Sequence, residues 1–263
     1  MIGWPELLLI AVVGVVSGAI NTIAGGGSLI TLPMLIFVGL PPGVANGTNR
    51  VGAVLQSASA TVQFHREGML NMAHVRRLVL PTSVGALLGT WLSIGIDDDQ
   101  FRTIIGVAMV IILPFVLLKP HKSREGDEDR DDDAAPKPPK EEAPPLPSWA
   151  QAIIFFFIGV YGGFLQAGVG VFLLTGLVRA CGFDLVRSNG VKVALVVVFA
   201  SLATAIFAWQ GMIAWAPAGA LAAGSVLGGW AGTKMAVSWG PRFIRWVLIV
   251  TVLASASKLI GLW

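Results

Sequence analysis

Apolar residues fill ten stretches of the chain, five on each side of a polar segment. A helix needs about 20 apolar residues to cross a hydrocarbon core of roughly 30 Å, so this pattern predicts an all-α polytopic membrane protein. In the first half the stretches run roughly over 4–23, 28–40, 44–64, 73–95 and 101–118, and in the second over 149–166, 170–182, 190–208, 214–235 and 243–262.

The second stretch of each half, at about 13 residues, is too short to cross the bilayer alone. It follows a glycine cluster, Gly25-Gly26-Gly27 in one half and Gly168-Val169-Gly170 in the other. We therefore interpret the first two stretches of each half as a broken helical hairpin whose turn lies inside the membrane, surrounded by protein or by a water cavity. Three full transmembrane helices would complete each half. Whether 28–40 and 170–182 cross or re-enter stays open.

The two halves are related in sequence. Residues 18–72 align with 160–215, first at an offset of 142 and, after one inserted residue, at 143. This alignment places Arg50 over Lys192 and Gly26 over Gly168. A doubled apolar unit with a cation at the same internal position is typical of secondary transporters built from structural repeats. It divides the chain into a first transmembrane repeat, 1–118, a charged, proline-rich linker, 119–147, and a second transmembrane repeat, 148–263.

The charges of the loops predict that the repeats lie in opposite orientations. The connection 65–77 carries three arginines, and the connection 96–100 carries three aspartates. In the second half the pattern is exchanged, since 209–215 has no charge whereas Lys234, Arg242 and Arg245 flank the next connection. Positively charged loops stay in the cytoplasm. We therefore expect inverted repeats in a bacterial inner membrane, with the linker cytoplasmic and both termini outside.

Composition excludes several other classes of protein. The hydrophobic fraction is 55%, charged residues make up 13%, and the mean hydropathy is +0.76, too apolar for a soluble domain. The single cysteine, Cys181, excludes an internal disulfide and a multi-cysteine metal site. Neither a GxxxxGK[ST] loop nor an HExxH motif occurs, so we expect no ATP-driven step, no enzymatic activity and no cofactor. The expected partners are the lipid bilayer and a small anion, without nucleic acid; a homodimer is compatible with the sequence.

One glycine-rich motif resembles a known family. The residues Asn21-Thr-Ile-Ala-Gly25-Gly26-Gly27-Ser28-Leu-Ile-Thr31-Leu-Pro33, followed by Ala45-Asn46-Gly-Thr-Asn49-Arg50, are similar to the TauE/SafE membrane permeases. The resemblance covers almost the whole chain outside the linker. It implies movement of sulfite, organosulfonates or, in some members, carboxylates. The second copy has Val169 between its glycines and Gly163 in place of Asn21, so the two half-sites differ chemically.

Helices that begin inside the membrane suit an anion, because their first N–H groups and the positive ends of their dipoles are free to interact with it. Arg50 could pair with a sulfonate or carboxylate through two hydrogen bonds, whereas Lys192 would act as a point charge. Three alternatives stay open: the glycines serve only packing, the cations snorkel to an interface, and the asparagines cap helices. The predicted substrate-binding residues are Asn21, Gly25, Gly26, Gly27, Ser28, Thr31, Asn46, Asn49, Arg50, Gln166, Gly168, Gly170, Asn189 and Lys192.

The sequence thus favours a secondary transporter that exposes a midplane site alternately to the two sides of the membrane. A channel-like anion facilitator is the nearest alternative. A carboxylate transporter is a second one, and a membrane enzyme is disfavoured because no paired intramembrane carboxylates occur.

Overall fold

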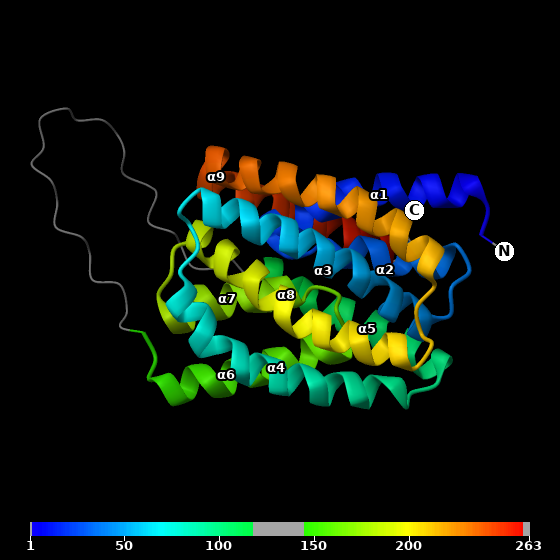
Figure 1. Cartoon of the computed structure of the whole chain (residues 1–263), viewed down its shortest axis with the longest axis horizontal. Helices are drawn as coiled ribbons and strands as arrows, with labels where there is room; N and C mark the ends of the chain where they lie inside the picture. The colour runs from blue at the N-terminus through cyan, green and yellow to red at the C-terminus, as the bar shows by residue number, and fades with distance from the viewer. Residues whose placement is uncertain (1, 118–144, 260–263) are drawn as a thin grey trace, which may run out of the picture.

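The computed structural model describes residues 2–117 and 145–259 (Figure 1). Within these two ranges the chain is helical and contains no strand, as the hydropathy pattern predicts. The helices are α1 Trp4–Ala24, α2 Ser28–Phe37, α3 Pro42–Arg66, α4 Met72–Ile94, α5 Asp98–Leu117, α6 Ser148–Phe164, α7 Val169–Cys181, α8 Leu185–Trp209 and α9 Trp215–Leu259.

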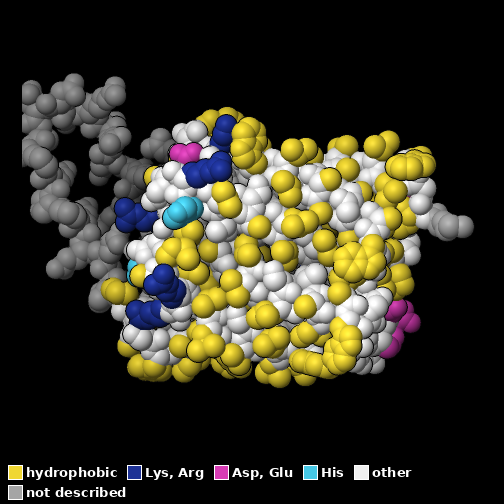
Figure 2. Space-filling view, viewed as in Figure 1, with side chains coloured by type: hydrophobic (Ala, Val, Ile, Leu, Met, Phe, Trp, Pro, Cys, Tyr) yellow, Lys and Arg dark blue, Asp and Glu magenta, His cyan; other side chains and the backbone are white. Residues whose placement is uncertain are grey.

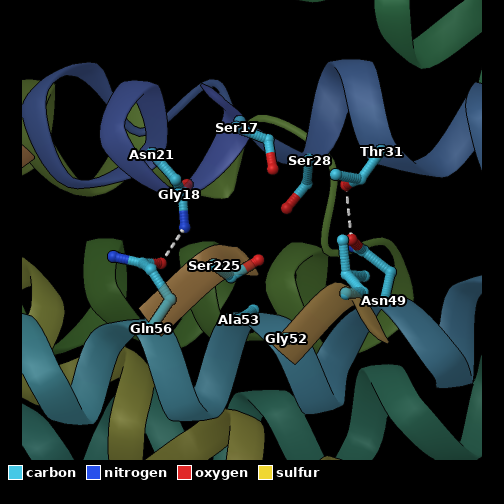
Figure 3. Close-up of a pocket in the computed structure, with 12 residues that line it drawn as sticks. Ser17, Gly18, Asn21, Ser28, Thr31, Asn49, Gly52, Ala53, Gln56 and Ser225 are labelled. Atoms are coloured by element: carbon cyan, nitrogen blue, oxygen red, sulfur yellow. Dashed lines mark hydrogen bonds between the residues drawn. The ribbon is translucent and has the colours of Figure 1, made fainter. Parts of the chain in front are cut away.

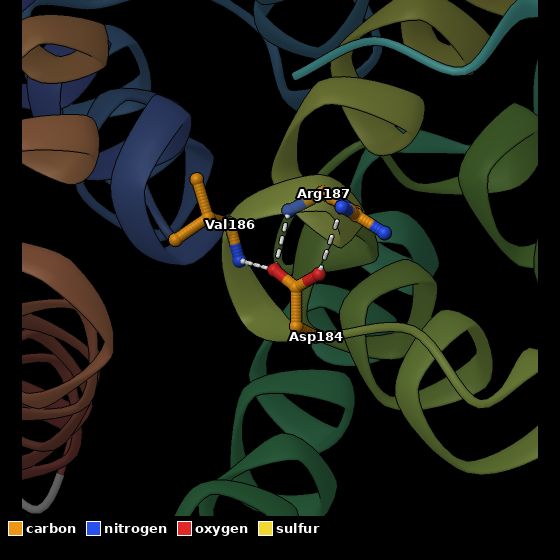
Figure 4. Close-up of polar contacts among 3 residues, drawn as sticks. All are labelled: Asp184, Val186 and Arg187. Carbon is orange, nitrogen blue, oxygen red and sulfur yellow. Dashed lines mark hydrogen bonds and ion pairs between the residues drawn. The ribbon is translucent and has the colours of Figure 1, made fainter. Parts of the chain in front are cut away.

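The start of α8 lies five residues before the predicted apolar stretch because a side chain caps it. One carboxylate oxygen of Asp184 accepts hydrogen bonds from the backbone N–H groups of Val186 at 3.0 Å and Arg187 at 2.9 Å (Figure 4). Such a cap satisfies N–H groups that have no partner within the helix. The other oxygen lies 3.4 Å from the Arg187 guanidinium, an exposed pair of little energetic weight. The cap places Lys192 about two turns into α8.

The predicted gap between the last two apolar segments is a bend within one helix. The sequence suggested a break between 235 and 243, but the backbone is helical from Trp215 to Leu259. Figure 1 shows that α9 is bent: its orange first part runs to the left, and its red last part returns to the right, where both termini lie. Polar residues lower the hydropathy of this stretch, and Pro241, which lacks an N–H group, removes one helical hydrogen bond. The Gly240-Pro241 pair stands within the helix, and proline is a usual cause of sharp bends.

The two halves of the chain interleave. The first helix of each half packs along the fourth apolar segment of the other half, so that α1 lies on α9 and α6 lies on α4. Glycines bring these backbones together. A Cβ atom built on Gly89 of α4 would lie 1.9 Å from the carbonyl oxygen of Val160, and one on Gly224 of α9 would lie 1.9 Å from that of Ala11. Close packing through glycine is characteristic of membrane helices.

The outer surface is that of a membrane protein. Among the described residues, three helices are long and apolar enough to span a bilayer, over Trp4–Ile23, Met72–Ile94 and Leu185–Trp209, while α2, α6 and α7 are shorter apolar helices. Hydrophobic side chains cover much of the face shown in Figure 2. Large hydrophobic residues that are exposed include Leu80, Phe157 and Leu227. In the same view, Lys and Arg side chains gather at the left end, and a group of acidic side chains lies at the right end.

Candidate functional site

The turns of the two broken hairpins cross at the centre of the molecule. Gly25 lies between α1 and α2, and Gly170 lies in the first turn of α7. A Cβ atom on Gly25 would lie 2.3 Å from the carbonyl carbon of Gly170, and one on Gly170 would lie 2.3 Å from the Cα of Gly25. Gly25 and Gly168 also have positive φ angles, 78° and 71°, which glycine adopts without strain. These positions therefore require glycine for backbone contact and for the turns.

Arg50 is fully buried and binds the end of the helix that precedes the second turn. Its Nη1 donates to the carbonyl oxygen of Gly162 at 3.0 Å and to Oε1 of Gln166 at 3.2 Å. Its Nη2 donates to the carbonyl oxygen of Gly163 at 2.5 Å. The guanidinium also lies 4.8 Å from the centre of the Phe207 ring, within the range of a cation–π interaction.

Lys192, which is 1% exposed, binds the end of α1 in the same way. Its Nζ donates to the carbonyl oxygens of Asn21 and Thr22, each at 2.9 Å, and to Oδ1 of Asn189 at 2.6 Å. Asn189 Nδ2 in turn donates to the carbonyl oxygen of Ile23 at 3.0 Å. Because neither Lys192 nor Arg50 reaches the surface, the alternative that they snorkel to an interface is wrong.

The two cations form reciprocal contacts between the halves. Asn21 and Gly163 are equivalent in the repeat alignment, as are Lys192 and Arg50, and each cation donates to the equivalent carbonyl of the opposite half. Asn46 adds to the Arg50 side, where its Nδ2 donates to the carbonyl oxygen of Phe164 at 3.0 Å. The C-termini of α6 and α1 are thus each held by a cation and an amide from the opposite half.

A pocket lies beside the first turn, between α1 and α2 above and α3 below in Figure 3, and α9 closes it. Its cavity volume is about 10 Å³, room for about one water molecule. No side chain that lines it carries a charge. The lining residues are Ser17, Gly18, Asn21, Gly27, Ser28, Thr31, Asn49, Gly52, Ala53, Gln56, Leu221 and Ser225.

Hydrogen bonds order the three side-chain amides of this pocket, Asn49 at one end and Asn21 with Gln56 at the other. Thr31 Oγ1 donates to Oδ1 of Asn49 at 2.5 Å, and Asn21 Nδ2 donates to Oε1 of Gln56 at 2.6 Å (Figure 3). Gln56 Nε2 donates onward to Oγ1 of Thr22 at 2.5 Å. The Nδ2 group of Asn49 is buried and has no hydrogen-bond partner among the residues that the structure describes. An unsatisfied buried donor is rare, and here it stands beside a pocket.

The predicted residues therefore separate into three groups. The pocket brings together Asn21, Gly27, Ser28, Thr31 and Asn49. The cations and the remaining polar residues bind helix ends outside the pocket lining: Arg50, Asn46 and Gln166 at α6, Lys192 and Asn189 at α1. Gly25, Gly26, Gly168 and Gly170 are buried in and around the two turns.

Sequence reasoning missed Gln56, Ser17 and Ser225 in the pocket lining. Gln56 is an amide in the middle of a long helix, and that position alone was a signal. Ser17 and Ser225 had no such signal, because serine is frequent in packed membrane helices. In the part of the chain that the structure describes, no cluster of His, Cys, Asp and Glu could hold a metal ion.

The sequence matches the family described as "Sulfite exporter TauE/SafE" over residues 10–259. Similar proteins include a "Probable membrane transporter protein" of Haemophilus influenzae, 31% identical over 98% of this chain and 96% of its own length. The "Probable membrane transporter protein ORF9" of a Sinorhizobium species is 28% identical over 97% and 92%, and YfcA of Escherichia coli K12, also a probable membrane transporter, is 28% identical over 94% and 87%. No solved structure matches the chain significantly.

Proposed function

Because the chain belongs to the sulfite exporter TauE/SafE family, we propose that it is a secondary transporter of a small anion, with sulfite or an organosulfonate as the favoured substrate. The chain aligns with probable membrane transporters over most of their lengths. This similarity supports transport rather than catalysis. The choice of an anion rests on the electrostatics of the two helix breaks.

The observation that carries this proposal is the placement of Lys192 and Arg50 at helix C-termini. A helix end carries roughly half a unit charge, negative at the C-terminus and positive at the N-terminus. At a break between two helices these charges would largely cancel. Lys192 binds the carbonyl groups at the end of α1, and Arg50 binds those at the end of α6. The cations offset the negative ends, so the N-termini of α2 and α7 leave each break with a net positive charge. Such a break favours an anion.

Alternating access would use the two halves as inverted repeats. The reciprocal contacts support this arrangement. Gly47 approaches Met212, where a Cβ would lie 2.2 Å from the carbonyl oxygen, and Gly190 approaches Met69, where a Cβ would lie 2.8 Å from the carbonyl oxygen. The pocket holds about one water molecule. Binding an anion as large as sulfite therefore requires its walls to move apart, and α9, which contributes Leu221 and Ser225, is the wall from the second half.

The charges at the two ends support the orientation inferred from the loops. The α3–α4 and α7–α8 connections lie at the left end of Figure 1, and Lys and Arg side chains gather at the left end of Figure 2. Exposed arginines in or beside these connections are at positions 66, 76, 77, 179 and 187. We place this end on the cytoplasmic side of a bacterial inner membrane and the end with Asp97–Asp99 on the outer side. Of the predicted cytoplasmic linker, 119–147, the structure describes only residues 145–147. The predicted side of the rest lies outside the described residues.

Transport by the purified protein in liposomes tests this function. Sulfite and methanesulfonate uptake should saturate with concentration and should accelerate when the same anion is loaded inside, which is the counterflow expected of a carrier. Acetate tests the carboxylate alternative. Flux that rises linearly without counterflow would indicate a channel-like facilitator. Absence of flux for all three anions, in liposomes of either protein orientation, would reject the proposal.

A further inference from the structure

We infer that the pocket beside the first helix break is the anion subsite, and that Asn49 and Ser225 donate hydrogen bonds to the anion there while Thr31 positions Asn49. This inference rests on the proposed function and identifies the side chains that would carry its specificity. Of the three, only Ser225 comes from the second half of the chain.

The orientation of the Asn49 amide points to a ligand that accepts hydrogen bonds. Thr31 Oγ1 donates to Asn49 Oδ1 at 2.5 Å, so the oxygen side of the amide is occupied. The Nδ2 side is buried and has no partner in the described part of the chain. Asn49 is only 2% exposed and lines the pocket. A buried donor without a partner is costly, and an anion oxygen would remove that cost. Thr31 thus determines which end of the amide is presented to the pocket.

Two serines offer further donors. Figure 3 shows the hydroxyl groups of Ser28 and Ser225 turned toward the space between α2 and α3. Neither hydroxyl has a hydrogen-bond partner among the described residues, whereas Ser17 already donates to the carbonyl oxygen of Gly14 at 3.2 Å. Ser28 begins α2, whose N-terminal end favours negative charge. Two free hydroxyls, one free amide N–H group and a helix N-terminus therefore meet at one pocket.

The absence of charge in the pocket lining fits this assignment. A carboxylate there would repel an anion, and none of the lining residues is acidic. A cation in direct contact would hold the anion tightly and slow its release. Lys192 instead acts from behind the carbonyl group of Asn21, itself a lining residue. Neutral donors with a nearby positive charge suit an anion that must bind and leave.

Ser225 also connects binding to movement. It lies on α9, where its backbone packs on α1: a Cβ on Gly18 would be 2.5 Å from the Ser225 carbonyl oxygen. A small outward shift of α9 would widen the pocket for sulfite while Ser225 stays within hydrogen-bonding reach of the anion. A larger displacement of α9 would remove this donor and open the pocket.

The test uses sulfite and methanesulfonate binding to purified full-length protein, measured by calorimetry together with thermal unfolding. Asn49→Leu, similar in volume but without a donor, should weaken binding about 10- to 100-fold, as expected for a hydrogen bond to a charged group. Ser225→Ala should weaken it about tenfold. Thr31→Val should weaken it about tenfold, and Thr31→Ser, which keeps the hydroxyl, should restore most of the affinity.

Two matched controls separate the site from the fold. Thr82→Val and Ser93→Ala make the same changes at buried positions whose hydroxyls bind carbonyl groups of their own helix, α4. Both should bind like the wild-type protein. If the wild type transports and binds these anions but Asn49→Leu, Ser225→Ala and Thr31→Val bind equally well, the subsite is wrong and the proposed function stands. If the wild type binds neither anion and transports none, both proposals fall.

Discussion

Gly25 and Gly170 meet backbone to backbone, with 2.3 Å between the position of a Cβ on either one and the nearest main-chain atom of the other. Gly25 belongs to the first broken hairpin and Gly170 to the second, so this contact joins the two helix breaks directly. It fixes the N-termini of α2 and α7 at the centre of the molecule, with Lys192 and Arg50 at the preceding C-termini.

Gly170→Ala should destabilise the protein strongly. The added Cβ would lie 2.3 Å from Gly25 Cα, a main-chain atom that cannot rotate away, so the two hairpins must separate. Overpacking of this kind costs about 1–3 kcal/mol or more. Thermal unfolding in detergent, followed by size-exclusion chromatography, measures the effect. Gly219→Ala in α9, where a Cβ meets nothing within 4 Å, is the control and should be neutral or slightly stabilising. Equal stability of the two variants would contradict the crossing.

Lys192→Met should lower both stability and anion affinity. Methionine fills a similar volume but leaves the carbonyl groups of Asn21 and Thr22 without their donor, at a cost of about 1–3 kcal/mol. It also removes the positive charge that offsets the end of α1. Sulfite binding to the folded fraction of the variant measures the second effect separately. Wild-type affinity in Lys192→Met would show that the cation serves only the fold.

Arg50→Lys should retain part of both properties. A lysine keeps the charge but has one ammonium group, whereas the guanidinium spans the carbonyl oxygens of Gly162 and Gly163 and Oε1 of Gln166. We expect an intermediate melting temperature, between those of the wild type and Arg50→Ala, and an intermediate sulfite affinity. If Arg50→Lys matched Arg50→Ala in both measurements, the geometry of the guanidinium rather than its charge would be essential.

Asp184→Ala should cost about 1 kcal/mol of stability through the loss of the α8 cap, and Asp184→Asn should recover most of it because an amide oxygen also accepts from the helix N–H groups. Chemical unfolding of the purified variants measures the difference. Sulfite affinity should not change, since Asp184 is exposed at the end of the molecule. A large loss of affinity in Asp184→Asn would mean that this end takes part in transport.

Labelling of single cysteines tests the orientation. In a Cys181→Ser background, Gln100→Cys should react with an impermeant maleimide in intact cells, and His65→Cys should react only after permeabilisation. Both residues are exposed, on opposite sides of the proposed membrane. The reverse pattern would invert the topology, and labelling of both in intact cells would reject the proposed membrane placement of α3 or α4.

The sequence by itself determined the helical class, the short helices after the glycine clusters and the family, because hydropathy, glycine and a local motif act over a few neighbouring residues. Hydropathy marked the apolar stretches, and the first short helix begins at Ser28 as drawn. Hydropathy misplaced the start of α8, where a capping carboxylate rather than apolarity sets the boundary. It also predicted a gap in α9 where the structure has a bend.

Only the tertiary structure decided which polar groups meet. Arg50 and Gly163 are separated by 113 residues, and Lys192 and Asn21 by 171, so no local pattern could pair them. The alignment of the halves showed that the cations are equivalent, but not that each one binds the opposite half. Ser225 gave no signal at all, because a serine acquires such a role only when packing places its hydroxyl at a pocket beside other donors. Pairings of this kind depend on how α9 lies against α1 and α3, and that arrangement follows from the packing of the whole chain.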